Sequence, residues 1–345
     1  MFSENDKLFP AIRAKIRSEV GKASSLWQIR LSRVVAVVAI ALSAAFLTGN
    51  ASAAPLRVVA TTGMVADLVS EVGGPHVTVQ TLAKSGVDPH LYKLTRVDLN
   101  ALLRSDVVFF SGLALEGKMF DSLDRIRKSG KPVIGIADSL PAEHLLALPG
   151  DYQYDPHAWM DVALWSLGVS TVLETLSAQL PQHASELEQR AANYQSQLKL
   201  LDSRIRTAIQ TIPEHRRVLV TAHDAFGYFG RAYGIDVIGV QGVSTESEAG
   251  LRRIETLVNT LVAQQVPTVF VESSVSARNV KALIAGAAAQ NHVVTIGGQL
   301  YSDAMGKAGT WEGTYPGMLE HNASVIASSL GGKPLSESLK SNTNE

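Results

Sequence analysis

The sequence contains no cysteine among its 345 residues. The absence excludes disulfides, so stability has to come from packed apolar cores. It also excludes thiolate ligands, so any metal site must be built from imidazole and carboxylate groups. A bacterial lipoprotein carries its lipid on a cysteine at the cleavage site, and we therefore expect this protein not to be a lipoprotein.

The sequence has little net charge, with 31 Lys and Arg against 32 Asp and Glu. No basic field is present of the kind that binds nucleic acid, and there is no acidic tail. A glycine-rich phosphate loop ending in Gly-Lys-Ser or Gly-Lys-Thr is also missing, so the chain carries no nucleotide site of that type.

A long apolar run is missing as well. The most apolar stretch, residues 34–47, is shorter than the roughly 20 residues that span a bilayer. It follows Arg30 and Arg33 and leads into the Ala-x-Ala pattern of residues 51–53. These are the parts of a secretory signal, and we assign residues 1–53 to a cleavable signal with an extended N-region, with export to the periplasm. An uncleaved membrane anchor is the alternative, and the true start of the protein could lie downstream of Met1.

From residue 56 onward, short β-branched runs alternate with longer helical patterns, which predicts parallel sheets built from βαβ units. The strands expected in the first half are Leu56–Thr61, Val77–Leu82, Val107–Ser111 and Pro132–Ala137. Those expected in the second half are Val218–Ala222, Asp236–Gln241, Thr268–Glu272 and Val293–Ile296. The fold class is therefore α/β, with two lobes of mostly parallel four-stranded sheets.

A segment without strand character, Glu186 to Ile212, separates the two sets of strands. Its apolar residues are spaced alternately four and three apart, which predicts one continuous helix with a single apolar stripe. Ser185 and Glu188 form a capping-box pattern, and Pro213 marks the end. The stripe also suits a coiled-coil dimer, but a helix flanked by α/β lobes favours a rigid connector. We therefore expect an N-terminal lobe at 54–182, a linking helix at 183–213, a C-terminal lobe at 214–332 and a disordered tail at 333–345.

The sequence has nine histidines. Six of them are interpreted as structural or solvated, because they lie in polar connections, beside a strand or in the last helix: His76, His144, His183, His215, His292 and His321.

Two further histidines share a motif. Asp-Pro-His occurs at residues 88–90 and again at residues 155–157, each time in a loop after an expected strand. Proline restricts the local backbone and so helps to fix the direction of the next side chain. Asp-Pro is common in turns, so one copy alone carries little weight. Two copies in equivalent loops indicate a shared role for His90 and His157.

Two more candidates follow strands of the second half. His223 comes directly after the strand ending at Ala222, and Asp303 follows the last strand. Ligands bind beyond the carboxyl ends of the strands in open α/β sheets, so facing lobes bring His90, His157, His223 and Asp303 to one cleft. Three imidazoles and one carboxylate suit Zn, Mn or Fe. His223 alone could instead be a capping or packed residue, and Asp303 a helix N-cap.

At these residues the chain resembles the TroA-like zinc- and manganese-binding proteins of bacterial ABC transporters. The similarity extends from Leu56 to about Gly331. Its most specific parts are the two Asp-Pro-His loops and residues 221–229, 239–248, 271–274 and 313–318. The resemblance implies two lobes joined by one rigid helix, and four metal ligands that fall on His90, His157, His223 and Asp303.

The resemblance leaves the metal open. Members regarded as manganese-specific usually have Glu as the third ligand, whereas this chain has His223. Many dedicated zinc importers carry a His- and acid-rich loop before the second ligand, but the stretch 140–155 has His144 as its single histidine and few acidic residues. We expect one zinc or manganese ion as cargo, with iron less favoured.

The resemblance also implies the partners: a membrane permease with a separate ATPase, and no nucleic acid. We expect a monomer without enzymatic activity. One alternative is a metal-dependent hydrolase in the same cleft, with Asp224 or Glu246 as general base. The other is a surface adhesin, which no residue supports directly.

Overall fold

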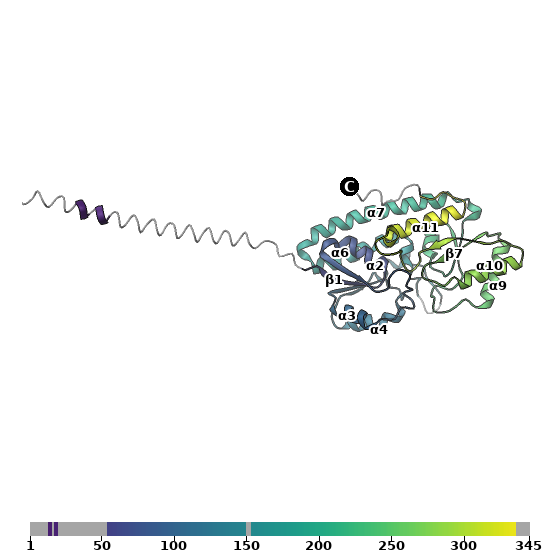
Figure 1. Ribbon diagram of the computed structural model, residues 1–345, viewed down its shortest axis with the longest axis horizontal. Coiled ribbons are helices and arrows are strands. Elements are labelled where there is room, and N and C mark those ends of the chain that lie inside the picture. The colour runs from purple at the N-terminus through teal and green to yellow at the C-terminus, as the bar shows by residue number, and fades with distance from the viewer. Residues whose placement is uncertain (1–12, 16, 20–53, 150–152, 336–345) are drawn as a thin grey trace, which may run out of the picture. The chain divides into compact units, whose positions relative to one another are not determined.

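A computed structural model describes residues 13–15, 17–19, 54–149 and 153–335 (Figure 1). The apolar stretch 34–47 and residues 336–345 of the expected tail lie outside these ranges. Within them, no helix has the length and apolar character needed to cross a membrane. Residues 55–345 form one compact unit, and the fold below is that of its described part.

The first lobe is built on a four-stranded sheet in which every ladder is parallel. Its strands are β1 (Leu56–Ala60), β2 (Val77–Thr81), β3 (Val107–Phe110) and β4 (Val133–Gly135), in the spatial order β2-β1-β3-β4. All four expected strands of the first half are confirmed. A parallel sheet places the carboxyl ends of its strands on one edge, which is where the loops after β2 and β4 begin.

Helices cover both faces of this sheet, as parallel sheets require. They are α2 (Gly63–Gly73), α3 (Arg96–Arg104), α4 (Phe120–Lys128) and α6 (Gly168–Gln179), and the short helix α5 (Val162–Ser166) packs against α6. Side chains alternate between the faces: Val58 and Phe109 join the cluster under α2 and α6, and Val59 and Val108 join the cluster under α3 and α4. Figure 1 shows these two pairs of helices on opposite sides of β1.

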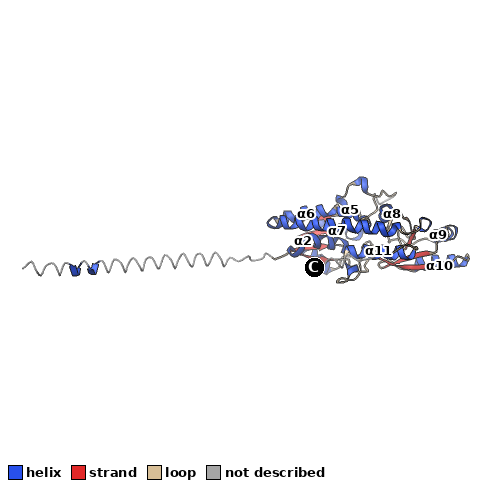
Figure 2. Ribbon diagram, turned by 90° about the horizontal axis from the view of Figure 1, so that it is seen from above, coloured by secondary structure: helices blue, strands red, loops and turns tan. Residues whose placement is uncertain are grey.

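One long helix, α7 (Ala184–Gln210), runs along both lobes (Figures 1 and 2). At about 1.5 Å per residue its length is on the order of 40 Å. It packs against α2, α5 and α6 of the first lobe and against α8 (Gly227–Tyr233) and α11 (Tyr315–Ser329) of the second. Every residue of the predicted stripe is buried: Leu187, Ala191, Tyr194, Leu198, Leu201, Ile205, Ala208 and Ile212.

The start of α7 differs from the expected capping box. The helix begins two residues earlier than predicted, its N-cap is His183, and no side chain caps the free amides there. A short 3-10 turn, Pro181–His183, leads directly into the helix, so Ser185 already lies inside the first turn. The pattern Ser185–Glu188 therefore predicted the wrong cap.

The second lobe contains all four strands expected there: β5 (Val218–Thr221), β6 (Asp236–Gly239), β7 (Thr268–Glu272) and β8 (Thr295–Leu300). They form two parallel pairs, β5-β6 and β7-β8, with β5 and β7 side by side, in place of one continuous four-stranded ladder. The last strand is displaced by two residues at its start because Val293 is 78% exposed and precedes the ladder. The helices are α8 (Gly227–Tyr233), α9 (Leu251–Ala263), α10 (Arg278–Ala289) and α11 (Tyr315–Ser329).

Candidate metal centre

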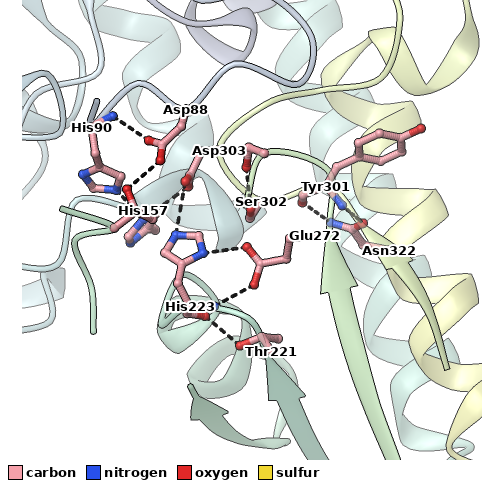
Figure 3. Close-up of polar contacts among 12 residues, drawn as sticks. Asp88, His90, His157, Thr221, His223, Glu272, Tyr301, Ser302, Asp303 and Asn322 are labelled. Carbon is pink, nitrogen blue, oxygen red and sulfur yellow. Dashed lines mark hydrogen bonds and ion pairs between the residues drawn. The ribbon is translucent and has the colours of Figure 1, made fainter. Parts of the chain in front are cut away.

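The four residues predicted as ligands lie in four separate loops, each after the carboxyl end of a strand. His90 follows β2, His157 follows β4, His223 follows β5 and Asp303 follows β8. The two lobes face each other across these loops, so the side chains of all four residues meet at one point (Figure 3). The prediction that they converge is thus met in the structure.

The distances between the four side chains match the size of a single metal ion. His157 Nε2 lies 3.3 Å from one carboxylate oxygen of Asp303, and His223 Nε2 lies 3.2 Å from the other. His90 Nε2 and His157 Nε2 are 3.4 Å apart. Four ligands at the usual zinc distances of about 2.0–2.1 Å and tetrahedral angles would lie about 3.3 Å from one another.

All four side chains are withdrawn from solvent, with exposed fractions of 2% or less. His223 Nε2 and both carboxylate oxygens of Asp303 are buried without a hydrogen-bond partner. A buried polar atom without a partner is costly, and a bound cation would satisfy all three at once. The donor set therefore fits one divalent ion.

Carboxylates outside the four predicted ligands fix the orientation of two of the histidines. Asp155 Oδ1 lies 2.7 Å from His157 Nδ1 and also accepts the His157 backbone N–H at 2.9 Å. Glu272 Oε2 lies 2.6 Å from His223 Nδ1, and its Oε1 accepts the His223 backbone N–H at 2.9 Å. A carboxylate at Nδ1 keeps the proton there, which leaves the Nε2 lone pair free for a metal.

His90 is positioned by a different contact. Asp88 Oδ1 accepts the His90 backbone N–H at 2.8 Å, while Asp88 Oδ2 accepts the Thr245 hydroxyl at 2.6 Å. Thr245 belongs to the second lobe, so this contact connects the loop of His90 to the opposite lobe. In both Asp-Pro-His motifs the aspartate thus accepts the backbone N–H of its own histidine.

Hydrogen bonds from Asn322 and Trp159 help to hold the segment that carries Asp303. Asn322 on α11 binds both backbone groups of Tyr301, accepting at 2.9 Å and donating at 2.7 Å. Trp159 Nε1 donates to the Ser302 carbonyl at 3.0 Å. Because Trp159 follows His157 by two residues, a ligand loop of the first lobe is bonded directly to one of the second.

The charges of the protein itself favour protonation of two ligands. Burial alone would lower the pKa of His157, but Asp155 and Asp303 outweigh it and raise this pKa to about 9. For His223, Asp303 and Glu272 likewise outweigh burial, and its pKa rises well above the usual range. The pKa of His90 falls to about 3, mainly because of burial. Protons and metal ions therefore compete for the same nitrogen atoms.

Sequence reasoning missed the supporting residues Asp155, Glu272, Asp88 and Thr245. The two aspartates are part of the repeated motif, so the motif already contained that signal. Glu272 lies 49 residues from its histidine, and only the fold brings the two together. Thr245 is separated from Asp88 by 157 residues.

The two residues considered as general bases have other surroundings. Glu246 is 41% exposed at its side chain and pairs with Lys118 at 3.0 Å. Asp224 is the neighbour of His223 and packs against Gly239, and burial followed by the charge of Asp155 raises its pKa. Among the described residues, the buried group able to hold an ion consists of His90, His157, His223 and Asp303 alone.

Comparisons with known proteins agree with the fold. The family profile of ZnuA, described as zinc-uptake complex component A, periplasmic, matches residues 58–329. The chain is 46% identical over 282 residues to the manganese-binding lipoprotein MntA of Bacillus subtilis, covering 82% of this chain and 92% of MntA. It is 45% identical over 273 residues to the zinc-binding protein TroA of Treponema pallidum, covering 79% and 88%.

The solved structure of the periplasmic zinc-binding protein TroA from Treponema pallidum superimposes with a TM-score of 0.78 at 45% identity. The match covers 80% of this chain and 99% of that structure. The two-lobed α/β architecture with parallel strands and one long helix is confirmed by this likeness.

The relatives correct the predicted localisation. MntA is named a lipoprotein. The manganese ABC transporter substrate-binding protein PsaA of Streptococcus mitis is also named a lipoprotein. It is 28% identical to this chain, and the match covers 81% of this chain and 91% of PsaA. The prediction that lipid anchoring is excluded is therefore wrong. The prediction assumed that a lipid must be attached to a cysteine thiol, and these 345 residues contain no cysteine. Relatives of the chain are nevertheless named lipoproteins.

A family match over most of the chain, a relative at 46% identity and a shared two-lobed fold lead to one assignment. The chain belongs to the ZnuA family of metal-uptake substrate-binding proteins.

Proposed function

We propose that this chain captures one divalent transition-metal ion, zinc or manganese, on His90, His157, His223 and Asp303 and delivers it to a membrane permease. The observation that carries the proposal is the approach of four buried ligand side chains from both lobes, with ligand atoms all within 4.8 Å of one another. The proposed partners are a permease and a separate ATPase, which supplies the energy for import. We propose that the carrier itself acts as a monomer.

The ligand set favours a carrier over a hydrolase. Catalytic zinc keeps an open position for water beside three protein ligands, whereas this centre offers four protein ligands in a site closed to solvent. Neither Glu246, which pairs with Lys118 at the surface, nor Asp224 belongs to the ligand group. We therefore propose that the protein carries an ion and catalyses no reaction.

The choice between zinc and manganese depends on more than the donor atoms. Three imidazoles favour zinc, and a carboxylate accommodates manganese as well. The two relatives of nearly equal identity are named for different metals, MntA for manganese and TroA for zinc. We propose that both ions bind and that zinc binds more tightly, as the usual affinity order of divalent metals predicts.

Release has to act through loops or through tilting of the second lobe. The helix α7 packs against helices of both lobes along its length, which opposes a wide hinge opening. His223 and Asp303 lie on the second lobe, so a small tilt would separate them from His90 and His157.

The test is elemental analysis and competitive titration with zinc and manganese on metal-stripped protein. We expect one tightly bound equivalent of either ion, and its loss in His157→Ala. His215→Ala is the matched control, because His215 is exposed and lies just beyond the end of α7. An absence of tight binding, or tight binding unchanged in His157→Ala, would refute the proposal.

A further inference from the structure

A second group of side chains with metal-ligand chemistry lies away from the cleft: His76, His183 and Glu186. His76 ends a short 3-10 turn directly before β2, His183 directly precedes α7, and Glu186 lies in the first turn of α7. Both histidines were interpreted from the sequence as solvated, but both are partly buried and their rings stack. One atom from each residue lies within 4.8 Å of the other two.

This group is at the opposite edge of the first sheet from the four-ligand centre. His76 precedes β2 and His90 follows it, so the five residues of β2 separate the two places. At about 3.3 Å per residue the strand alone spans roughly 17 Å. An ion held by this group would thus be independent of the cargo.

We propose that His76, His183 and Glu186 form a second metal site that takes zinc in preference to manganese. Two imidazoles and one carboxylate are a known zinc ligand set, and they leave a fourth position for water. Manganese prefers oxygen ligands, of which this site has only one side chain, whereas zinc lies higher in the affinity order for nitrogen donors.

The geometry needs little change to accept the ion. His76 Nε2 already lies 2.8 Å from Glu186 Oε2, and insertion of zinc would widen this distance to about 3.3 Å. The ring centroids of His76 and His183 are 3.8 Å apart with 21° between the planes. The rings must turn so that both nitrogens point to one spot. Glu186 is 51% exposed at its side chain and has room to follow.

Two features make this site weaker than the centre. Arg190 lies one turn further along α7, packs over Gly74 and acts electrostatically on Glu186, so a positive charge opposes the ion. The free amides at the start of α7 have the same effect, since a helix N-terminus is positive. Bound zinc would connect the start of β2 to the start of α7 and exchange readily through its water position.

Equilibrium dialysis of the full chain against zinc and, separately, manganese tests the proposal. We expect two zinc equivalents, the second weaker than the first, and one manganese equivalent. His183→Ala and Glu186→Gln should each weaken the second zinc equivalent at least tenfold, because loss of even an indirect metal contact costs about 10–100-fold. His183 makes no capping bond to α7, so its removal should leave the helix intact, which a thermal melt checks.

Two controls separate this site from the first. His157→Ala should abolish tight binding yet keep the weak zinc equivalent, and His215→Ala should keep both. Imidazole NMR signals of His76 and His183 should shift only as the second equivalent binds. A single zinc equivalent in the wild type, a second one that survives both substitutions, or loss of the second one in His215→Ala would overturn the proposal.

Discussion

His157 lies between two carboxylates, Asp155 at Nδ1 and Asp303 at Nε2. Because they outweigh burial and raise its pKa to about 9, the nitrogen that should bind metal holds a proton below that pH. Lower pH therefore favours the protonated, metal-free form throughout the neutral and acidic range. We expect metal affinity to fall from pH 8 to pH 5, by about tenfold per unit for each proton displaced.

Competition with a chelator of known affinity at each pH measures this dependence, and calorimetry in two buffers counts the protons released. Asp155→Asn removes one of the negative charges that raise the pKa of His157. The plot of metal affinity against pH should therefore become less steep near neutral pH. An affinity that stays constant over this pH range would mean that imidazole is not the ligand.

Glu272 is the partner of His223, with contacts to both its ring and its backbone N–H. In Glu272→Gln the charge that aligns the ring is lost, and an amide N–H can face Nδ1–H. We expect a loss of about 10–100-fold in metal affinity with the fold retained. Titration checks the affinity, and Glu255→Gln, an exposed position on α9, serves as control. Equal losses in the two variants would contradict the role given to Glu272.

At this scale, the sequence predicted which four side chains come together and missed the groups that orient them. His90 and His157 could be found because their motif is repeated within short loops. Glu272 could not, because the end of β7 reaches His223 only once β5 and β7 lie side by side. Thr245 was missed for the same reason, since it approaches Asp88 from the other lobe.

At the level of the element, α7 is held by one buried stripe. Leu201 is fully buried, whereas its neighbour Leu200 is 47% exposed. Leu201→Ala should lower the free energy of unfolding by about 2–5 kcal/mol, because it leaves a cavity in the main apolar core. Leu200→Ala should change it by less than about 1 kcal/mol. Urea unfolding of both variants measures the difference, and similar losses would show that the stripe does not support the helix.

The spacing of apolar residues predicted the helices and strands well, because burial of one face or of both faces determines which positions in the sequence are apolar. The eight strands and the stripe of α7 were predicted for this reason. Strand pairing in the second lobe was predicted less well, because an apolar run does not specify which backbone ladder it joins. The predicted N-cap of α7 was wrong, because a 3-10 turn leads directly into the helix and places Ser185 inside its first turn.

At the scale of the whole molecule, two contacts made by the adjacent residues Thr245 and Glu246 cross from one lobe to the other. Thr245 donates to Asp88 at 2.6 Å, and Lys118 pairs with Glu246 at 3.0 Å. The first is a hydrogen bond to a charged group, worth about 1.5–3 kcal/mol. Because Asp88 also holds the His90 backbone, this bond stabilises the arrangement in which His90 faces the second lobe.

Thr245→Val should therefore speed metal release by about tenfold or more and change capture little, since most affinity differences between related complexes lie in the rate of dissociation. A stopped-flow chase with excess chelator measures the release. Trp159 fluorescence offers a signal, because its ring lies 5.2 Å from that of His157. Thr256→Val on α9 is the control. Unchanged release in Thr245→Val would show that the contact between lobes does not retain the ion.

The position of the four proposed ligands on loops far apart in the sequence also has a consequence for the lifetime of the protein. An unfolded chain scatters these side chains, so only the folded state binds the ion with all four. An ion at 100 times its dissociation constant then adds about 2.7 kcal/mol to the free energy of unfolding. A carrier that has just given up its cargo would be the form that unfolds and is proteolysed most readily. Metal supply would thus regulate the abundance of the protein as well as its occupancy.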